Sequence, residues 1–334
     1  MTEVHEVHKH LYHYTNLEGL KGILDTQTLW ATHFKGLNDS SEIELMRPLL
    51  EEKLFELINA IVSKDAKKCS KYKRKIEKLG GITKASRGEA KNFTDFMYKR
   101  MFLRAPGLVP MAEPYILSFC GHTNHDDYVK KNGLLSQWRA YGGDGGYALI
   151  LDTLRLTKCL KVEPNTYSYS QFLFGDVLYD DQSDKFETVF ADLHRGLEAW
   201  TCALEVSKKL PDENLAQPFF NVATRFKHRG FKEESEVRVS VSPVTEALEK
   251  TVCETSLLKL KPIQHREKDG SQVRYIVLND VPKKKSLPII RIIIGPQRDQ
   301  KQRAKDVKKL IGKRKIEIVC SETPYLPPQA HISS

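Results

Sequence analysis

The chain has 334 residues, of which 40% are hydrophobic and 29% are charged. These proportions are typical of a globular protein with a packed core, and they exclude an intrinsically disordered chain. The amino terminus shows neither the basic nor the apolar segment of a signal peptide, and no run of ~20 apolar residues could span a bilayer. We therefore expect a cytoplasmic protein without a membrane partner.

The formal net charge of +10 favours anionic partners. One group of lysines and arginines lies between Lys64 and Lys78, and a second extends from Lys283 to Lys315. Neither group alternates with aromatic residues in the way that a groove for single-stranded nucleic acid does. Two interpretations stay open: the charges form solvated helix faces, or they bind RNA or DNA.

The cysteines are scattered without a CxxC pair, which predicts reduced and mostly buried thiols. Cys120, His122 and His125 have a spacing that could bind zinc if a fourth ligand came from elsewhere. Polar loops commonly contain such residues, so we expect no metal site there.

The first predicted elements are a strand at residues 11–14 and a helix that begins after it. Thr15 and Glu18 have the spacing of a capping box for that helix. A second strand is predicted at residues 29–34, and residues 37–39 predict a turn that caps the next helix.

That next helix is predicted at residues 42–62, where apolar residues recur at helical spacing. Pro48 lies inside this range, so the helix either kinks there or begins there. A further helix is predicted at residues 89–103. Residues 40–110 are therefore expected to be a helical insertion within a single domain that spans residues 1–334.

After the insertion, strands and helices are interspersed in an order that does not fit a doubly wound sheet. We expect an α+β fold with a central mixed or split β-sheet, flanking helices and one cleft between the halves of the sheet. Strands are predicted at residues 115–120, 147–151, 160–163, 176–179, 234–242, 256–260, 273–278, 289–294 and 316–320, and helices at residues 185–208, 215–226 and 299–311.

Several common catalytic signatures are absent from the sequence. There is no GxxxxGK[ST] motif, and the glycine cluster at residues 142–146 precedes a strand instead of joining a strand to a helix. A Walker site and a Rossmann dinucleotide site are therefore not supported. The sequence also lacks HExxH and GxSxG, which argues against zinc peptidases and α/β-hydrolases.

Two motifs combine polar and aromatic residues. His13 ends a predicted strand, where it is either a hydrogen-bonded structural histidine or a ligand of a ribose hydroxyl. Trp138 and Tyr141 are three residues apart in a predicted helical turn, which places both rings on one side. They could stack on a flat heterocycle, although core packing explains Trp138 equally well.

A third motif places charges on a predicted strand. Glu234, Glu236 and Arg238 occupy alternate positions of that strand, so they are expected to share one face, with valines on the other. The row is either a solvated face with ion pairs across strands or part of a cleft that stabilises a cationic transition state.

The chain resembles a bacterial family known only as a domain of unknown function. The resemblance rests on the motifs HYT, LND, LSQWRAYG, FxxExExR and IIIGP, which are residues 13–15, 37–39, 135–142, 231–238 and 292–296 here. These motifs cover most of the chain apart from the predicted insertion. The resemblance by itself implies no activity.

The order of the histidine, the central aromatic residue and the late glutamate is similar to the H-Y-E arrangement of ADP-ribosyltransferases. This looser resemblance implies an ADP-ribosyltransferase-like fold that uses NAD as a substrate. It implies that His13 holds the nicotinamide ribose and that Tyr141 stacks on nicotinamide, with Trp138 and Tyr147 as alternatives for the stacking ring. The Ser-Thr-Ser strand typical of these enzymes is absent.

The same resemblance implies two catalytic residues. Glu236 would bond a ribose hydroxyl and stabilise the developing cation, and Glu234 would orient the acceptor. The residues expected to bind NAD are His13, Tyr14, Thr15, Ser136, Trp138, Tyr141 and Arg238.

We therefore expect an NAD-dependent ADP-ribosyltransferase that acts as a toxin or phage-defence effector on nucleic acid, with an antitoxin or regulatory protein as a candidate partner. Two other functions stay open. One is a non-catalytic module that binds nucleic acid or protein. The other is an NAD-independent hydrolase or nuclease that uses Glu234 and Glu236.

Overall fold

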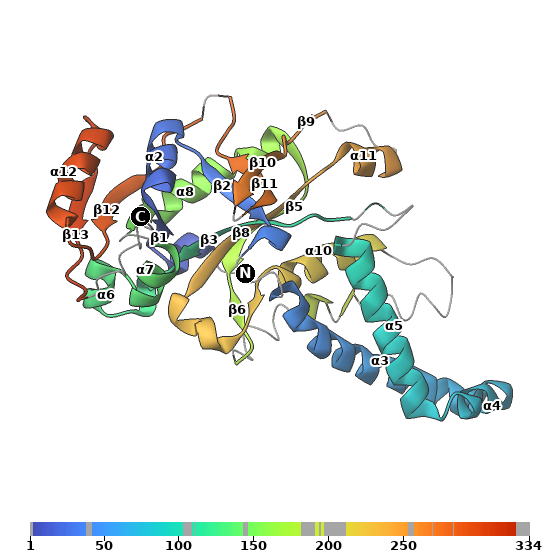
Figure 1. The fold of residues 1–334 in the computed structure, drawn as a ribbon. Helices are drawn as coiled ribbons and strands as arrows, with labels where there is room; N and C mark the ends of the chain where they lie inside the picture. The colour runs from blue at the N-terminus through green and yellow to red at the C-terminus, as the bar shows by residue number, and fades with distance from the viewer. Residues whose placement is uncertain are drawn as a thin grey trace.

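The computed structural model shows an α+β fold with a mixed sheet and flanking helices (Figure 1). It describes residues 3–37, 42–102, 109, 111–142, 146–181, 191–193, 195–196, 212–252, 257–268, 270–282 and 284–324. No helix in these ranges has the length and apolarity that crossing a membrane requires.

Eleven strands of the described residues form one sheet, in which antiparallel pairs predominate and β12 and β13 are parallel. The strands are β1 (His10–Thr15), β2 (Leu29–His33), β3 (Tyr115–Cys120), β4 (Tyr147–Asp152), β5 (Tyr167–Asp176), β8 (Glu236–Pro243), β9 (Lys259–Leu260), β10 (Gln264–Lys268), β11 (Ser271–Leu278), β12 (Ile289–Ile294) and β13 (Glu317–Cys320). The main path runs β10-β11-β2-β3-β1-β4-β12-β13, and β8 joins β3 to β5. The expectation of a mixed sheet is confirmed.

The sheet is split beside β3. All of β3 pairs with β8 along one edge, from Tyr115 to Cys120. Along the other edge β3 pairs with β1 at Cys120 and with β2 at Tyr115 and Ile116. At ~3.3 Å per residue, Ile116 and Cys120 lie about 13 Å apart. Between these points β1 and β2 separate and open a gap in the sheet.

Helices cover both faces of the sheet. On one face, α1 (Val4–Val7), α2 (Leu17–Thr26), α8 (Thr153–Leu160) and α12 (Gln300–Ile311) bury apolar residues against the strands, including the valines of β8. On the other face, α7 (Leu135–Tyr141) packs on β1 and β4 through Trp138. The short α6 (Asp127–Asn132) precedes α7, and α10 (Asp212–Ala223) packs beside β6 (Leu178–Tyr179) and β7 (Phe226–Lys227).

Three helices extend from the sheet as an arm (Figure 1): α3 (Arg47–Lys68), α4 (Ser70–Lys78) and α5 (Ile82–Phe102). A 3-10 turn, η2 (Glu42–Met46), leads into α3. Pro48 occupies the first turn of α3, where its missing N–H leaves no helical hydrogen bond unmade. The helix therefore begins near Pro48, as one of the two alternatives predicted. α3 and α5 pack along an apolar stripe that continues onto α10.

Local signals misplaced some boundaries. The side chain of Asn16, and not that of Thr15, caps α2 by accepting a hydrogen bond from the Gly19 N–H. Residues 160–163 are not a strand, because α8 continues to Leu160 and a 3-10 turn, η4 (Glu163–Asn165), follows. Strand β10 was not predicted, since its residues are polar and mostly exposed.

Other predictions fall outside the described residues. They concern Asn38 and Asp39 of the predicted turn and most of the helix predicted at residues 185–208. The remaining short elements include η1 (Phe34–Gly36), η3 (His122–Asn124), η5 (Arg229–Glu234) and α11 (Glu246–Val252).

Candidate functional site

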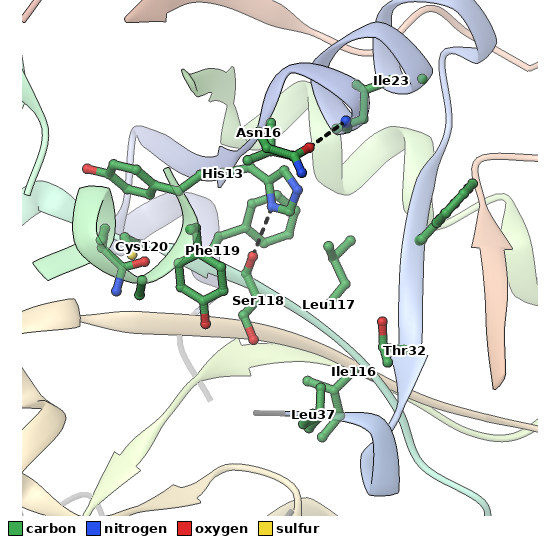
Figure 2. Close-up of a pocket in the computed structure, with 18 of the residues that line it drawn as sticks. His13, Asn16, Ile23, Thr32, Leu37, Ile116, Leu117, Ser118, Phe119 and Cys120 are labelled. Atoms are coloured by element: carbon green, nitrogen blue, oxygen red, sulfur yellow. Dashed lines mark hydrogen bonds between the residues drawn. The ribbon is translucent and has the colours of Figure 1, made fainter. Parts of the chain in front are cut away.

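A cavity of about 600 Å³ lies at the split between β1 and β2. Figure 2 shows His13 and Cys120 toward one side of the cavity and Thr32 and Ile116 toward the other. His13, Tyr141 and Glu236, which come from separate motifs, all line it. The fold thus brings the three residues to one cavity, whereas their roles stay predictions. The other expected site residues that line it are Tyr14, Thr15 and Glu234.

Two residues of β3 contact the side chain of His13 and fix its position. Its Nδ1 lies 3.2 Å from the carbonyl oxygen of Ser118, and its ring packs 5.6 Å from that of Phe119. Since a carbonyl only accepts, Nδ1 carries the proton and Nε2 is left as an acceptor. Burial lowers the pKa of His13, and the bond to Ser118 offsets part of that effect. A neutral imidazole can therefore accept a hydrogen bond from a ligand hydroxyl.

Tyr14 lines the cavity, but its hydroxyl bonds to other parts of the protein. That hydroxyl accepts a hydrogen bond from the Leu134 N–H at 2.8 Å and lies 3.0 Å from Nε2 of His122. Its ring meets the ring of Trp138 edge-on, with centroids 4.8 Å apart. Tyr14 therefore fixes the start of α7 on β1, and this helix in turn positions Tyr141.

Tyr141 and Trp138 occupy different environments. Trp138 is only 2% exposed, and its Nε1–H donates to the carbonyl of Asn132 at 3.1 Å. Tyr141 is 44% exposed and lines the cavity. Burial, followed by the charges of Glu236 and Glu234, raises the pKa of Tyr141 to about 12.

Trp138 and Ser136, which were also expected to bind NAD, do not line this cavity. Residues three apart on a helix differ by ~60° in direction, and that difference sends Trp138 into the core and Tyr141 to the cavity. Gln137, which was not predicted, also lines the cavity and is 4% exposed.

Glu236 is the first residue of β8 and is 4% exposed. Nε of Arg238 lies 2.7 Å from one of its carboxylate oxygens, and Nζ of Lys227 lies 2.7 Å from the other. Burial alone would raise the pKa of Glu236, but the two cations outweigh it and hold the pKa at about 2. Glu236 is therefore ionised at neutral pH.

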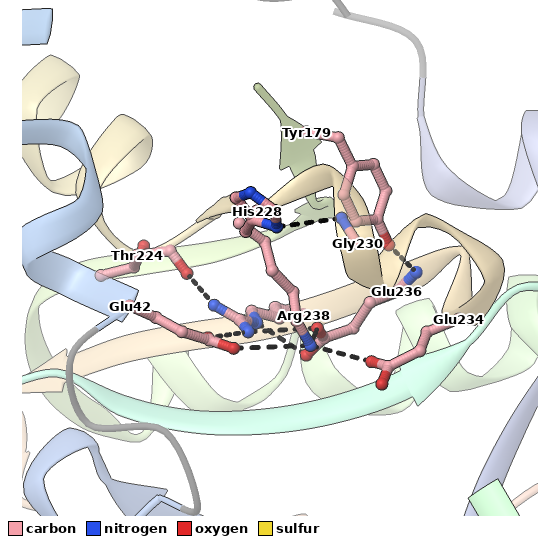
Figure 3. A network of polar contacts seen from close by, with 9 residues as sticks. Glu42, Tyr179, Thr224, His228, Gly230, Glu234, Glu236 and Arg238 are labelled. Atoms are coloured by element: carbon pink, nitrogen blue, oxygen red, sulfur yellow. Dashed lines mark hydrogen bonds and ion pairs between the residues drawn. The ribbon is translucent and has the colours of Figure 1, made fainter. Parts of the chain in front are cut away.

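Glu42 completes the buried charges, as Figure 3 shows. It bonds Nη2 of Arg238 and lies 3.4 Å from Nζ of Lys227. Nη1 of Arg238 donates to the carbonyl of Thr224 at 3.0 Å. We call Glu42, Lys227, Glu234, Glu236 and Arg238 the ion network.

Glu234 does not lie on β8, contrary to expectation. It ends η5, and Ser235 takes a left-handed conformation with φ 43° before the strand begins. The two glutamates are brought together by Lys227, whose Nζ lies 2.8 Å from Glu234. Burial raises the pKa of Glu234, and Lys227 offsets part of that rise.

Arg238 was also expected to bind NAD, but it does not line this cavity. It is 3% exposed and forms an ion pair with the carboxylate of Glu236. Every residue of β8 is buried, so a solvated face is excluded as well. Lys227 and Glu42 were missed because no local spacing links them to Arg238, which is 196 positions from Glu42.

His122, at the start of the loop after β3, is buried in the core, whereas most of that loop is exposed. His122 is 1% exposed and contacts Tyr14, and Asp126 caps α6 by accepting from the Val129 N–H. Among the described residues, no group of three or more His, Cys, Asp or Glu is arranged to hold a metal ion.

The two basic groups lie at opposite ends of the molecule. The first includes α4, at the tip of the arm, and the second includes α12, beyond α2 (Figure 1). A second cavity of about 940 Å³ lies between α2 and α12 and shares Asn16 and Glu18 with the first. Only α12 therefore borders the region of the site.

Comparison with known proteins gives one similarity. Residues 137–239 match a family described as "Protein of unknown function (DUF2971)". No curated protein and no solved structure matches the chain at a significant level. The matched segment contains Tyr141, Glu234 and Glu236, but it does not reach His13. The chain is thus similar, over the part that carries the aromatic and acidic sides of the cavity, to a family whose description states no function.

Proposed function

We propose that the protein is an ADP-ribosyltransferase-like enzyme that cleaves NAD between nicotinamide and ribose and transfers the ADP-ribose. The observation that carries the proposal is the placement of His13, Tyr141 and Glu236 around one cavity at the split of the sheet. A volume of about 600 Å³ lies within the ~300–1,000 Å³ range of small-molecule sites.

Each of the three residues suits one part of the substrate. The half-exposed ring of Tyr141 offers a face on which nicotinamide can stack. Neutral His13 presents Nε2 as an acceptor for a ribose hydroxyl. The ionised carboxylate of Glu236 can bond a second ribose hydroxyl and favour positive charge on the sugar.

The reaction begins when the bond from ribose C1′ to nicotinamide N1 breaks. Its electron pair leaves with nicotinamide, which becomes neutral, and the ribose becomes an oxocarbenium-like cation. The nucleophile of the acceptor then bonds to C1′ and releases its proton to solvent. With water as the acceptor the product is ADP-ribose.

The ion network sets the electrostatics of this step. Lys227 and Arg238 keep Glu236 ionised, but their charges also oppose a cation nearby. The carboxylates of Glu42 and Glu234 bond the same two cations, so the network as a whole can still favour positive charge in the cavity. Glu234, at 18% side-chain exposure, is the better placed of these two to meet an acceptor.

The acceptor is proposed to be nucleic acid, as in a toxin or phage-defence effector. The support for this is the basic surface of α12 beside the second cavity, which adjoins the first. A regulatory protein such as an antitoxin would be expected to cover the surface of α12 and the second cavity beside it. NAD enters from the cytoplasm in this proposal.

The test is incubation of the full chain with NAD that carries the label in its adenine, together with RNA, DNA or protein. Release of nicotinamide and labelling of an acceptor are the expected results. Absence of both from the wild-type chain would contradict the proposal. Salt-sensitive binding of nucleic acid without any turnover would favour the non-catalytic module, which the lysines of α4 support.

A further inference from the structure

The end of the cavity opposite Glu236 is built differently from the end that holds the three motifs. Trp30 on β2 and Arg266 and Lys268 on β10 line it. Trp30 is 44% exposed although it lies within the sheet. A large exposed ring beside two cations is an arrangement that suits a nucleotide.

The aromatic part of this end is rigid. The rings of Trp30 and Tyr275 stack with centroids 4.3 Å apart and planes 30° apart. Tyr275 is 7% exposed, and its hydroxyl donates to Gln264 at 2.8 Å. Tyr275 thus supports one face of Trp30 and leaves the indole in a fixed orientation at the cavity.

Arg266 lies over the same pair of rings. Its guanidinium carbon is 5.4 Å from the ring centroid of Trp30 and 5.9 Å from that of Tyr275. In the part of the chain that the structure describes, no carboxylate pairs with Arg266 and its buried Nε has no hydrogen-bond partner. By contrast, Arg274 on the neighbouring strand β11 is paired with Glu113. An arginine without an acidic partner in a cavity is available to an anion.

Lys268 extends this positive end. Residues two apart on a strand share a face, so Lys268 lies on the same side of β10 as Arg266. The cavity therefore has acidic residues, Glu234 and Glu236, near one end of the split and basic residues near the other. The two ends of the split are about 13 Å apart at ~3.3 Å per residue, so a ligand that contacts both ends must be elongated.

We infer that Trp30, Arg266 and Lys268 bind the adenosine diphosphate half of the substrate, with adenine on Trp30 and the pyrophosphate on the two cations. This inference rests on the proposed function, because it assigns the cationic nicotinamide ring to the acidic end. The charges of NAD, positive on nicotinamide and negative on the pyrophosphate, then match the charges along the cavity.

The experiment is calorimetric titration of the full chain with ADP, which lacks nicotinamide, and with adenosine and inorganic pyrophosphate separately. Trp30→Ala should weaken ADP binding by about fivefold to a hundredfold, as expected when one base loses its stacking partner. Trp30→Phe should restore most of it. Arg266→Gln should weaken pyrophosphate binding and leave adenosine binding nearly unchanged, whereas Trp30→Ala should do the reverse.

Two substitutions away from the cavity serve as controls. Tyr128→Ala removes a ring that is 48% exposed on α6, and Arg87→Gln removes an arginine on the arm. Neither should change the affinity for ADP. Wild-type protein that does not bind ADP, or ADP binding that Trp30→Ala and Arg266→Gln leave intact, would overturn the inference.

The results separate this inference from the proposed function. Nicotinamide release that keeps its wild-type KM in Trp30→Ala and Arg266→Gln would overturn the inference and leave the transferase proposal standing. ADP binding that depends on both residues, in a protein that never releases nicotinamide, would support the nucleotide site and contradict the transferase.

Discussion

The carboxylate of Glu236 lies 2.7 Å from the ammonium group of Lys227, and both side chains are more than nine-tenths buried. Neither charge can be solvated when its partner is removed, so the pair links the stability of the fold to the site. Burial lowers the pKa of Lys227, but Glu236, Glu42 and Glu234 together outweigh that effect and raise it. Both groups are therefore charged at neutral pH.

Replacing Lys227 with methionine should destabilise the protein. Removing one partner of a buried ion pair typically costs about 3–5 kcal/mol, because the other charge is left uncompensated. Urea unfolding of wild type and Lys227→Met measures the free energy of unfolding. The control is Lys53→Met, which breaks the exposed pair with Glu56 and should change the stability little. Equal stability of Lys227→Met and wild type would show that water reaches the ion network.

Glu236→Gln should strongly slow nicotinamide release at temperatures where the variant is still folded. Loss of the carboxylate charge removes about 3 kcal/mol of transition-state stabilisation, which is a rate decrease on the order of a hundredfold. Lys227 and Arg238 would lose a partner, so a lower Tm is expected as well. Rates must therefore be measured at a temperature where circular dichroism shows the variant folded. Full activity in folded Glu236→Gln would remove Glu236 from the mechanism.

Glu234→Gln should separate release from transfer. Lys227 keeps Glu236 and Glu42 as partners in this variant, so the stability should change less than in Glu236→Gln. Nicotinamide release should continue, while labelling of the acceptor should fall because acceptor orientation is lost. Parallel assays of nicotinamide and labelled acceptor decide this. A proportional loss of both would assign Glu234 to the bond-breaking step instead.

Trp138→Ala should lower the stability of the protein, whereas Tyr141→Ala should weaken the binding of NAD. Trp138 is 2% exposed, and truncation of a buried tryptophan costs about 3–5 kcal/mol, so the free energy of unfolding should fall. Tyr141 is 44% exposed at the cavity, so Tyr141→Ala should mainly raise the KM for NAD. Tyr141→Phe keeps the ring and should retain low KM. A stable Trp138→Ala variant with a raised KM would reverse these assignments.

The lowered pKa of His122 predicts that the protein becomes less stable as the pH falls. Burial, with contributions from His125 and His8, lowers the pKa of His122 from 6.5 to about 3. Between these values the unfolded chain binds a proton that the folded chain does not, so stability falls as the pH drops from 6.5 toward 3. The slope from one such group is at most ~1.4 kcal/mol per pH unit.

Urea unfolding at several pH values tests this prediction in wild type and His122→Gln. The variant should show a flatter dependence between pH 6.5 and 4, even if it is less stable throughout. His228→Gln, at an exposed histidine, should keep the wild-type slope. An unchanged slope in His122→Gln would assign the acid sensitivity to other groups.

The basic groups at the two ends should act independently on nucleic acid. Replacing Lys71, Lys73, Lys75 and Lys78 of α4 with glutamine should weaken binding and lower its salt dependence, by about 0.9 in log–log slope for each phosphate that is no longer neutralised. The matching quadruple substitution in α12 uses Lys301, Lys305, Lys308 and Lys309. Only the α12 variant should also reduce labelling of a nucleic-acid acceptor. If binding is unchanged in both variants, the lysines are solvated helix faces.

The sequence by itself determined the strongly patterned elements and the side chains that can do chemistry. Residues 115–120 are a strand as predicted, and so are residues 289–294. The main helix of the arm begins near Pro48, one of the alternatives that the sequence allowed. These elements could be predicted because the spacing of apolar residues along the chain records which side of each element is buried.

The tertiary structure alone decided how the site is assembled. Glu42 reaches Arg238 across 196 positions, and Lys227 bonds two glutamates that do not share a strand. No local spacing encodes such contacts, because they depend on where η2, β7 and β8 meet. Trp138 and Tyr141 are both aromatic residues of one helix, and only the packing of α7 on β1 places one in the core and the other at the cavity.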